Sequence, residues 1–401
     1  CALPIWAAFV TSGDVTNPLV CTAGAAELNL QGMIDRANAG DTIKLSSNTE
    51  IAATLQITKN LTLDLNGCVL RMRGTGSVLK VSDRATLTIT DSSAAKSGTI
   101  TGGNAEDGGG VYVEAHATLE MTGGCITGCR AEDGGGVYID NNATLKMTGG
   151  CITDCHASYG GGGIYSYENL YMGGTAKIEK CTSKWGSDDA IWNRERCNIY
   201  ADGGTVDGTV NNQGTIRRSE GAAAETVFNG TVYNRSAGTI IAGIYNETVE
   251  NNGTITGGTF WGTVTNKKSA WGNEAGTISG GTFAVRFDTG DGTKPEPTPV
   301  EHNRTVLRPT SDPEKSGHTF VGWYLGDALY DFNTPVTAPL TLTARWEEVP
   351  SSGGNYYYHP TTDTKADDTK GSPKTADPGV ALYGALALLS LTGLTCTAKK
   401  R

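Results

Sequence analysis

The 401-residue sequence is poor in charged side chains and in proline. Asp, Glu, Lys and Arg make up 18% of it, against an average of about 25%, and proline occurs only 13 times. The low charge excludes a coiled coil and a disordered acidic chain, since both need many charged residues. The net charge of −10 gives no attraction to nucleic acid or to an anionic membrane, which leaves glycans and proteins as partners.

The common strings of catalytic residues are also missing. The sequence has no Gly-x-Ser-x-Gly, no His-Glu-x-x-His and no phosphate-binding P-loop. Its five histidines are isolated from one another, at positions 116, 156, 302, 318 and 359. These absences favour a protein that has no catalytic activity and no cofactor.

Glycine is abundant instead, with 55 residues, about twice the usual share. It does not recur at every third position, which excludes collagen. The residues around it are mostly Thr, Asn, Val and Ile, which favour strands and turns. The composition therefore predicts a long, turn-rich, all-β protein.

An internal repeat gives this prediction a definite form. Residues 99–124 align with residues 125–150 without a gap and are identical at 18 of 26 positions. A third copy begins at Cys151 and is one residue longer. A fourth, degraded copy has Asp-Asp-Ala-Ile-Trp at 188–192 where the others have Gly-Gly-Gly-Val-Tyr or Gly-Gly-Gly-Ile-Tyr. A fixed spacing of this size is typical of a solenoid or a propeller.

Each repeat contains short segments in which polar and apolar residues alternate, separated by glycine clusters, and no helical periodicity. This pattern is typical of two or three short strands per repeat. Stacked repeats of this kind form a parallel β-helix, whose coils pair at about 4.8 Å and whose inward residues form ladders of like side chains. We expect roughly ten coils, with Leu119 over Leu145 and Ile126 over Ile152.

A short amphipathic helix precedes the first strands. Its apolar residues fall at i, i+3, i+4 and i+7, and Gly40 ends it: Leu30, Met33, Ile34 and Ala37. The open end of a solenoid exposes strand edges and core, so this helix is predicted to cap it.

These elements carry a resemblance to a known fold. The helix, GDTI at 40–43 and ITKNLTLDLNG at 57–67 resemble the N-terminal cap and first coils of the right-handed β-helix, pectate-lyase-like superfamily, and the GGGVY and MTGGCITGC units resemble coils of bacterial surface β-helix proteins. The resemblance covers roughly residues 23–283 and implies a right-handed parallel β-helix. It also implies an alternative function, a surface-displayed polysaccharide lyase or glycoside hydrolase. If this alternative holds, replacing Asp188 or Asp189 by asparagine should abolish the activity. The polygalacturonase signatures Asn-Thr-Asp, Gly-His-Gly and Arg-Ile-Lys are absent.

A different module follows the repeats. Residues 285–346 contain, in order, FDTGDG, GHTFVGWY, YDF and LTLTARW, and their aromatic residues Trp323, Phe332 and Trp346 are the predicted core. The segment closely resembles the internalin B-type, or Listeria-Bacteroides, repeat. The resemblance implies a small β-grasp-like fold and a location on a bacterial surface.

The C-terminal end of the sequence suggests an anchor. Pro378 to Ala398 carry no charge, and as a helix they would measure about 31 Å, enough to cross a membrane. A basic Lys-Lys-Arg triplet follows, as at a cytoplasmic end. The order resembles a Gram-positive cell-wall sorting signal, with an LPXTG-like sortase motif at Ser372, Pro373, Lys374, Thr375 and Ala376. Ser372 and Ala376 depart from the motif. A plain C-terminal membrane anchor is the alternative.

At the other end, the sequence starts CALPIWAAFV, which has no basic segment and only a short apolar stretch. We expect residues 1–22 to be the remnant of a partial signal or leader region. A lipidated Cys1 is the alternative.

Several of the ten cysteines form a column in the repeat register. Cys125 and Cys129 recur as Cys151 and Cys155, and Cys181 and Cys197 are the candidates to continue the series. A buried thiol ladder is the favoured interpretation, with disulfides between coils or a zinc site as alternatives. Stacking on adjacent coils argues against zinc, which needs four ligands converging on one point.

Two acidic pairs also stack at the repeat spacing, namely Glu106-Asp107 and Glu132-Asp133. Like charges one coil apart raise each other's pKa or recruit a cation, which makes these four residues weak calcium candidates. A solvated turn is the favoured interpretation, and no metal or catalytic residue is assigned.

The sequence thus predicts five segments: an N-terminal remnant (1–22), a right-handed parallel β-helix (23–283), a Listeria-Bacteroides repeat (284–346), a flexible linker (347–371) and a sorting signal with a transmembrane helix (372–401). The predicted function is that of an extracellular protein of the Gram-positive cell wall, adhesin-like or ligand-displaying and without catalytic activity. Its partners would be sortase, peptidoglycan and a glycan or a protein of a host or neighbouring cell, and before sorting it would be anchored in the membrane.

Overall fold

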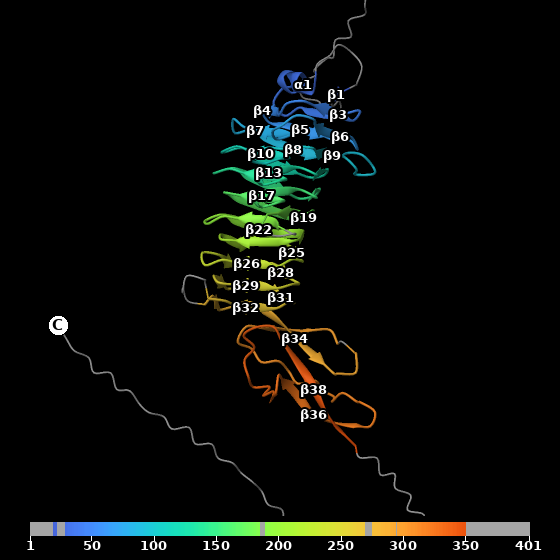
Figure 1. Cartoon of the computed structure of the whole chain (residues 1–401), viewed down its shortest axis with the longest axis vertical. Helices are drawn as coiled ribbons and strands as arrows, with labels where there is room; N and C mark the ends of the chain where they lie inside the picture. The colour runs from blue at the N-terminus through green and yellow to red at the C-terminus, as the bar shows by residue number, and fades with distance from the viewer. Residues whose placement is uncertain (1–18, 22–28, 185–188, 269–274, 294, 350–401) are drawn as a thin grey trace, which may run out of the picture. The chain divides into compact units, whose positions relative to one another are not determined.

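The computed structural model describes residues 19–21, 29–184, 189–268, 275–293 and 295–349. Nearly all regular structure in these residues is β-strand, stacked in parallel rungs below one short helix, α1 (Leu30–Arg36) (Figure 1). The predicted all-β parallel solenoid with an N-terminal helix is confirmed. The predicted C-terminal hydrophobic helix lies outside the described residues, and within them no helix is long and apolar enough to span a membrane.

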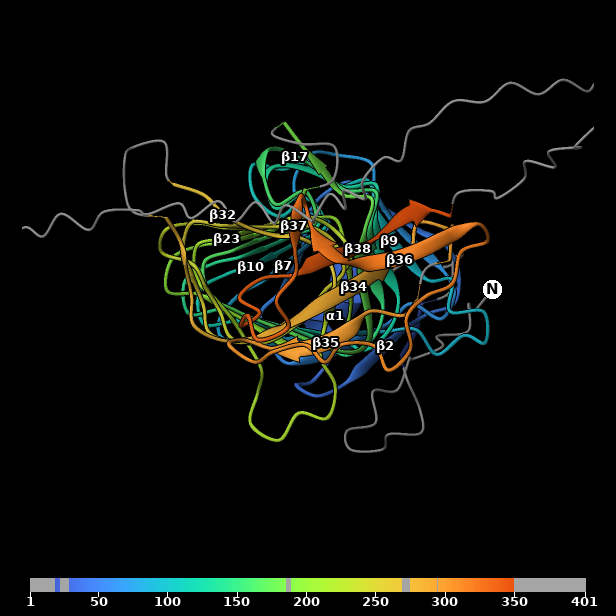
Figure 2. The ribbon, with the colours of Figure 1, turned by 90° about the horizontal axis from the view of Figure 1, so that it is seen from below.

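Sheet B is a ten-stranded face of the solenoid, and each of its strands pairs in parallel with the strand one coil further on. Seen along the stack, its strands lie over one another on one side (Figure 2). Its strands are β4 (Leu55–Ile57), β7 (Leu79–Val81), β10 (Val111–Val113), β14 (Val137–Ile139), β18 (Ile164–Ser166), β21 (Asp189–Asn193), β23 (Thr209–Asn212), β26 (Val232–Asn234), β29 (Val249–Asn251) and β32 (Val264–Asn266). The ten strands agree with the roughly ten coils that the sequence predicts.

Sheet A supplies two further columns of strands. The first contains β1 (Leu19–Cys21), β2 (Thr42–Leu45), β5 (Leu61–Asp64), β8 (Thr86–Thr90), β11 (Thr118–Met121), β15 (Thr144–Met147), β24 (Thr215–Arg217), β27 (Thr239–Ile240), β30 (Thr254–Ile255) and β33 (Thr277–Ile278). The second contains β3 (Thr49–Ile51), β6 (Val69–Met72), β9 (Thr99–Thr101), β12 (Cys125–Thr127), β16 (Cys151–Thr153), β25 (Val227–Phe228), β28 (Ile244–Tyr245), β31 (Thr259–Phe260) and β34 (Thr282–Asp288). Two long strands, β19 (Asn169–Glu179) and β22 (Asn198–Asp207), belong to both columns.

Three middle coils carry an additional short sheet, sheet C, formed by β13 (Arg130–Asp133), β17 (His156–Gly160) and β20 (Thr182–Ser183). Strands β13 and β17 end at the glycine clusters that lead into sheet B. Gly134 has φ of +63°, and a Cβ on Gly135 would lie 2.4 Å from the carbonyl oxygen of His156. Only glycine fits these bends, because the neighbouring coil passes too close for a side chain.

The strand registers confirm the predicted repeat and the predicted core stacks. Val111 pairs with Val137 of the next copy, and Val137 pairs with Ile164, so the extra residue of the third copy is accommodated before its sheet B strand. Leu119 stacks on Leu145 and Ile126 on Ile152, and all four are fully buried.

Towards the C-terminal end the coils become shorter. Val232 pairs with Val249, and Val249 with Val264, so each of these coils uses far fewer residues than a repeat of the middle region. Their interior is filled by four stacked aromatic rings, Phe228, Tyr245, Phe260 and Phe283, with centroids 4.9 to 5.5 Å apart. Stacked rings fill a narrow core with few residues, which suits a coil with a short perimeter.

A ladder of asparagine amides runs beside this aromatic core. Asn193, Asn212, Asn234, Asn251 and Asn266 follow one another, and each Nδ2 donates to the next Oδ1 at 2.8 Å. The first four side chains are fully buried. Because an amide both donates and accepts, a stack of identical amides can satisfy its own hydrogen bonds inside the core.

Helix α1 closes the first coil, as predicted. Leu30 and Ile34 are buried, and Asn29 caps the helix by accepting from the N–H of Gly32. The Gln31 amide accepts from the backbone N–H of Gln56 at 2.8 Å and donates to its carbonyl at 3.1 Å. Strand β4 is the edge strand of sheet B, and the Gln31 amide makes the two backbone hydrogen bonds that a neighbouring strand would otherwise make.

The C-terminal module closes the other end, which the sequence did not predict. Strand β34 belongs to both parts: Thr282 pairs with Thr259 of the last coil, and Val285 pairs with Leu340 of β38 (Leu340–Glu348). Strand β35 (Thr298–Glu301) then pairs antiparallel with β34 as one more rung. The expected boundary between residues 283 and 284 therefore falls inside a continuous strand.

The rest of the module is a small mixed sheet. Strand β36 (His318–Leu325) pairs antiparallel with β38 and with β37 (Ala328–Leu329). Trp323 is buried against Phe287, as predicted, with ring centroids 4.9 Å apart. Phe332 and Trp346 are only partly buried against this core. The indole N–H of Trp346 donates to the carbonyl of Thr289 at 2.9 Å.

The asparagine ladder yields a test of what stabilises the short coils. Replacing Asn234 by alanine leaves the Asn212 N–H and the Asn251 Oδ1 without their ladder partner inside the core. We expect Asn234→Ala to lower the free energy of unfolding by about 2 to 4 kcal/mol in urea denaturation. Asn246→Ala is the matched control, because it removes an exposed bond to Asn229 of 2.7 Å. Equal losses in the two variants would contradict a structural role for the ladder.

Candidate functional site

The predicted sortase motif, at Ser372, Pro373, Lys374, Thr375 and Ala376, lies outside the described residues. It stays a prediction from the sequence, and the sites described below belong to the solenoid and the module.

The two acidic pairs directly precede the glycine clusters that lead into sheet B, and Glu132 and Asp133 are the last residues of β13. Glu106 and Glu132 are exposed, whereas Asp107 and Asp133 are half-buried and face each other across an isolated bridge between neighbouring coils. Among the described residues no group of three or more His, Cys, Asp or Glu side chains is placed to hold a metal ion. The structure thus gives the four calcium candidates no further ligand.

Burial changes the chemistry of the two aspartates. It raises the pKa of Asp107 to about 6, with a further contribution from the negative charge of Asp133. Burial also raises the pKa of Asp133, although the N–H of Gly160 donates to this carboxylate at 3.3 Å. No hydrogen bond or ion pair to the Asp107 carboxylate occurs in the described part of the chain. Of the four acidic residues for which a solvated turn was expected, the two glutamates are exposed and the two aspartates are only partly exposed.

Asp189, one of the two carboxylates named for the enzyme alternative, is the buried first residue of strand β21. Its side chain is 2% exposed and accepts from the N–H of Gly161 at 3.0 Å and from the amide of Asn211 at 3.5 Å. Burial raises its pKa, and hydrogen bonds from Ser183, Gly161 and Asn211 oppose that rise. The bonds tie Asp189 to the neighbouring coils. Asp188 lies outside the described residues.

The cysteines divide into two kinds. Cys125 and Cys151 face outward on adjacent coils and form a disulfide, with Cα atoms 4.5 Å apart. The favoured thiol ladder is wrong for this pair, because the in-register coils approach closely enough for a bond. Cys129, Cys155 and Cys181 form the buried thiol column that the repeat predicts.

The Cys155 thiol at the centre of this column is suited to packing. Hydrogen bonding with the thiols of Cys129 and Cys181, together with burial, holds the pKa of Cys155 above its ordinary value. A protonated, buried thiol is neither a nucleophile nor a metal ligand. Cys197 does not continue this column: it directly precedes β22, where Asn198 hydrogen-bonds to Asn169 of the coil before.

Sequence reasoning missed a stack of aromatic side chains on the outer side of sheet B, in which Tyr165 is buried. The strand registers place four outward residues over one another: Tyr112, Tyr138, Tyr165 and Trp192, here called the aromatic column. Neighbouring ring centroids lie 5.4, 5.8 and 6.2 Å apart. The available signal was the aromatic residue that stands two positions after the glycine cluster in three copies and after Asp-Asp-Ala in the fourth.

Polar groups surround the aromatic column. The Tyr112 hydroxyl donates to Asp140 at 3.1 Å, and Arg194 donates to the Tyr165 hydroxyl at 2.8 Å while lying 4.6 Å from the ring of Tyr167. Burial is the main cause that raises the pKa of Tyr112 and Tyr138, with contributions from nearby carboxylates. The tyrosine hydroxyls therefore stay protonated and can donate.

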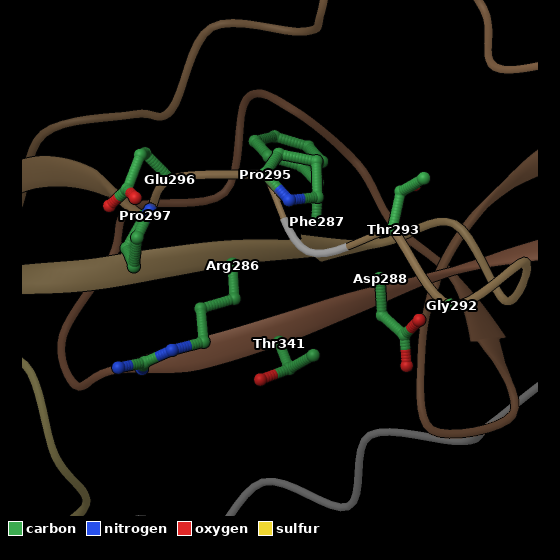
Figure 3. A pocket seen from close by; sticks show the side chains of 9 residues that line it. All are labelled: Arg286, Phe287, Asp288, Gly292, Thr293, Pro295, Glu296, Pro297 and Thr341. Carbon is green, nitrogen blue, oxygen red and sulfur yellow. The ribbon is translucent and has the colours of Figure 1, made fainter.

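The module contains a separate cavity of about 450 Å³. Arg286 and Asp288 lie along β34 and Thr341 on β38, facing the proline-rich segment around Pro295 and Pro297 (Figure 3). The Arg286 guanidinium donates to the carbonyl of Trp261 in the last coil. The positive charge of Arg286 is thus hydrogen-bonded to the solenoid, and Asp288 and Glu296 add two negative charges to the lining. The lining therefore carries both signs of charge and does not indicate whether a ligand would be an anion or a cation.

The fold and these surfaces define a class, a repeat-rich β-solenoid that ends in a compact β-module. Residues 283–345 match the model of the Listeria-Bacteroides repeat domain, which confirms the resemblance found in the sequence.

Two curated proteins of Evansella cellulosilytica are similar to a stretch of 69 residues. One is named "Putative Gly-rich membrane protein" and is 35% identical, and the other is named "Putative membrane protein" and is 38% identical. The stretch makes up 16% of this chain and only 8% and 10% of the relatives, so the match spans about a tenth of their length. No solved structure matched the chain.

The raised pKa of Asp107 predicts a pH dependence of stability. The folded protein binds this proton more tightly than the unfolded chain, whose aspartates titrate at about pH 4. The free energy of unfolding should therefore fall as the pH rises from about 4 to about 6, and level off above that. In urea titrations across this range Asp107→Asn should lose this component. Glu106→Gln, which removes a charge from the exposed neighbour, should keep it. A wild-type component that persists in Asp107→Asn would contradict the assignment.

The disulfide gives a second prediction. A digest under non-reducing conditions should contain one peptide pair linked through Cys125 and Cys151. The double variant Cys125→Ser/Cys151→Ser should lose about 3 kcal/mol of unfolding free energy, because the bond closes a loop with a sequence separation of 26. A reductant should bring the wild type down to this level and leave the double variant unchanged. Cys68→Ser, at a half-buried free thiol, is the control, and the same loss there would count against the disulfide.

Proposed function

We propose that this chain is a cell-wall-anchored bacterial surface protein. Like an adhesin, it would display a ligand-binding surface, and it would have no catalytic activity. The observation that carries the proposal is the Listeria-Bacteroides repeat at residues 283–345, joined without a break to a long solenoid. The membrane-protein names of the two relatives support a location at the cell envelope.

The sequence after the module supports the manner of attachment. An LPXTG-like pentapeptide, an uncharged stretch and a basic triplet follow one another over residues 372–401. In this proposal sortase cuts after Thr375 and joins the chain to peptidoglycan, and the stretch from Pro378 to Ala398 holds the protein in the membrane until then.

The solenoid supports a display role. We assign residues 23–283 to the pectate-lyase-like superfamily because of the parallel coils and the capping helix. Hydrolysis of a polysaccharide needs two carboxyl groups on either side of the scissile bond. Asp189 is only 2% exposed at the start of β21, and Asp107 and Asp133 lie opposite each other on adjacent coils. This arrangement favours binding over cleavage, with a glycan or a protein of a host or neighbouring cell as ligand.

Cell fractionation tests the anchor. Digestion of the wall should release the wild-type protein, whereas detergent alone should leave it in the wall fraction. Thr375→Ala removes the residue after which the sortase cuts, so this variant should move to the detergent-soluble membrane fraction. Thr369→Ala, in the preceding linker, is the matched control and should stay in the wall. Wild-type protein in the cytosol, or released by detergent alone, would overturn the proposal.

A further inference from the structure

We propose that the C-terminal module is a mechanical clamp, which holds the solenoid to the cell wall while a bound ligand pulls on it. This inference rests on the proposed wall anchor and goes beyond it, because it assigns a load-bearing role to two strands, β34 and β38. Three observations lead to it: the strands that carry the two ends of the module, their relative direction, and the way in which β34 joins the solenoid.

The chain enters and leaves the module through two strands that are hydrogen-bonded to each other. Strand β34 continues directly from the last coil, and β38 is the last strand of the described chain. The two strands are parallel, with four registered pairs that begin with Val285 and Leu340 and end with Asp288 and Thr343. They run side by side through the module (Figure 1). Tension between the solenoid and the wall therefore acts on this pair of strands.

The direction of the two strands decides how the tension acts. In a parallel pair the first residues of both strands lie at one end and the last residues at the other. The solenoid pulls on the start of β34, whereas the wall pulls on the end of β38, so the strands are drawn along each other in opposite directions. All the hydrogen bonds between them then share the load and must break together. If the load reached both strands at the same end, the bonds would open one after another at a lower force.

Buried apolar side chains shield this row of hydrogen bonds from water. Val285 and Leu342 are 0% exposed, and Phe287 packs edge to face on Trp323. Strand β36 pairs with the other edge of β38 over six residue pairs, so sliding of β38 also breaks a second row of hydrogen bonds. A hydrogen bond that is shielded from water finds no replacement partner while it breaks, which makes it costlier to break.

The joint between the module and the solenoid is built in the same way. Strand β35 pairs with one edge of β34 from Thr282 to Val285. The other edge of β34 pairs first with β31 of the last coil, at Thr282 and Phe283, and then with β38 from Val285 onward. The first half of β34 thus overlaps the solenoid and its second half overlaps the module. The Arg286 guanidinium adds a hydrogen bond to the carbonyl of Trp261 in the solenoid. A pull along β34 therefore loads both overlaps in shear.

Single-molecule force measurements on the purified full-length chain test the proposal by pulling in two directions. One handle is always attached at Thr375, where the wall would hold the chain, and the other at one of two exposed glutamates, Glu247 in the solenoid or Glu296 beyond the end of β34. From Glu247 the pull shears β34 against β38, whereas from Glu296 it reaches both strands at the same end and peels them apart. We expect the module to unfold in one step that releases roughly 200 Å of chain. The shearing force should be about twofold or more above the peeling force, because four residue pairs share the load.

A matched pair of variants separates mechanical strength from equilibrium stability. Val285 and Val336 are both 0% exposed, but only Val285 lies in the pair of strands β34 and β38. Both Val285→Ala and Val336→Ala should lower the stability in urea, because each removes buried methyl groups. In the shearing direction only Val285→Ala should lower the unfolding force. Equal forces in the two pulling directions, or equal losses of force in the two variants, would overturn the clamp.

The outcomes stay separate from those of the fractionation experiment. The force measurement uses purified protein and needs neither a sortase nor a ligand. Equal forces in the two directions would therefore remove the clamp and leave the wall anchor standing. Release of the wild-type protein by detergent alone would remove the anchor without changing the measured forces.

Discussion

The solenoid of this protein depends on the in-register, parallel hydrogen bonding of one coil to the next. This pairing places each residue directly above its counterpart about 4.8 Å away. A residue type that packs well at one position of a coil can then recur at the same position of the next coils and form a stack, as leucine, asparagine and tyrosine do here. The same geometry makes an unfavourable choice costly, because a charge or a Cβ at the wrong position meets the neighbouring coil. The glycine bend at Gly135 shows that limit, since the carbonyl of His156 occupies the space of a side chain.

Coil stacking alone leaves two open ends, and the structure closes them by different means. At the first coil the Gln31 amide of α1 pairs with the backbone of Gln56, so a side chain completes the strand edge. At the last coil a whole strand, β35, is laid antiparallel on β34, and the His302 ring meets Phe283 edge to face. The Listeria-Bacteroides module thereby acts as a cap of the solenoid, and the two parts share one continuous sheet.

Much of the fold could be predicted because each stacked coil repeats the same pattern of strands and bends in its sequence. The repeat register located the strands, and the alternation within each repeat assigned Leu119 and Ile126 to the core. The site could be predicted less well. All cysteines in the register look alike in the sequence, but whether a thiol points inward, as Cys155 does, or outward, as Cys151 does, depends on where the bend falls. The same holds for Asp107, whose half-burial follows from the path of the glycine turn.

The sequence by itself determined the repeat, the all-β class, the N-terminal cap and the small module, because each of these is encoded in local spacing or in a contiguous string of residues. Only the tertiary structure decided which faces the stacked side chains occupy. Tyr112, Tyr138 and Tyr165 are separated by a full coil in the chain and become neighbours only when the coils stack. The outward aromatic column, the disulfide and the shared strand at the module boundary all arise between coils, where sequence distance and spatial distance differ most.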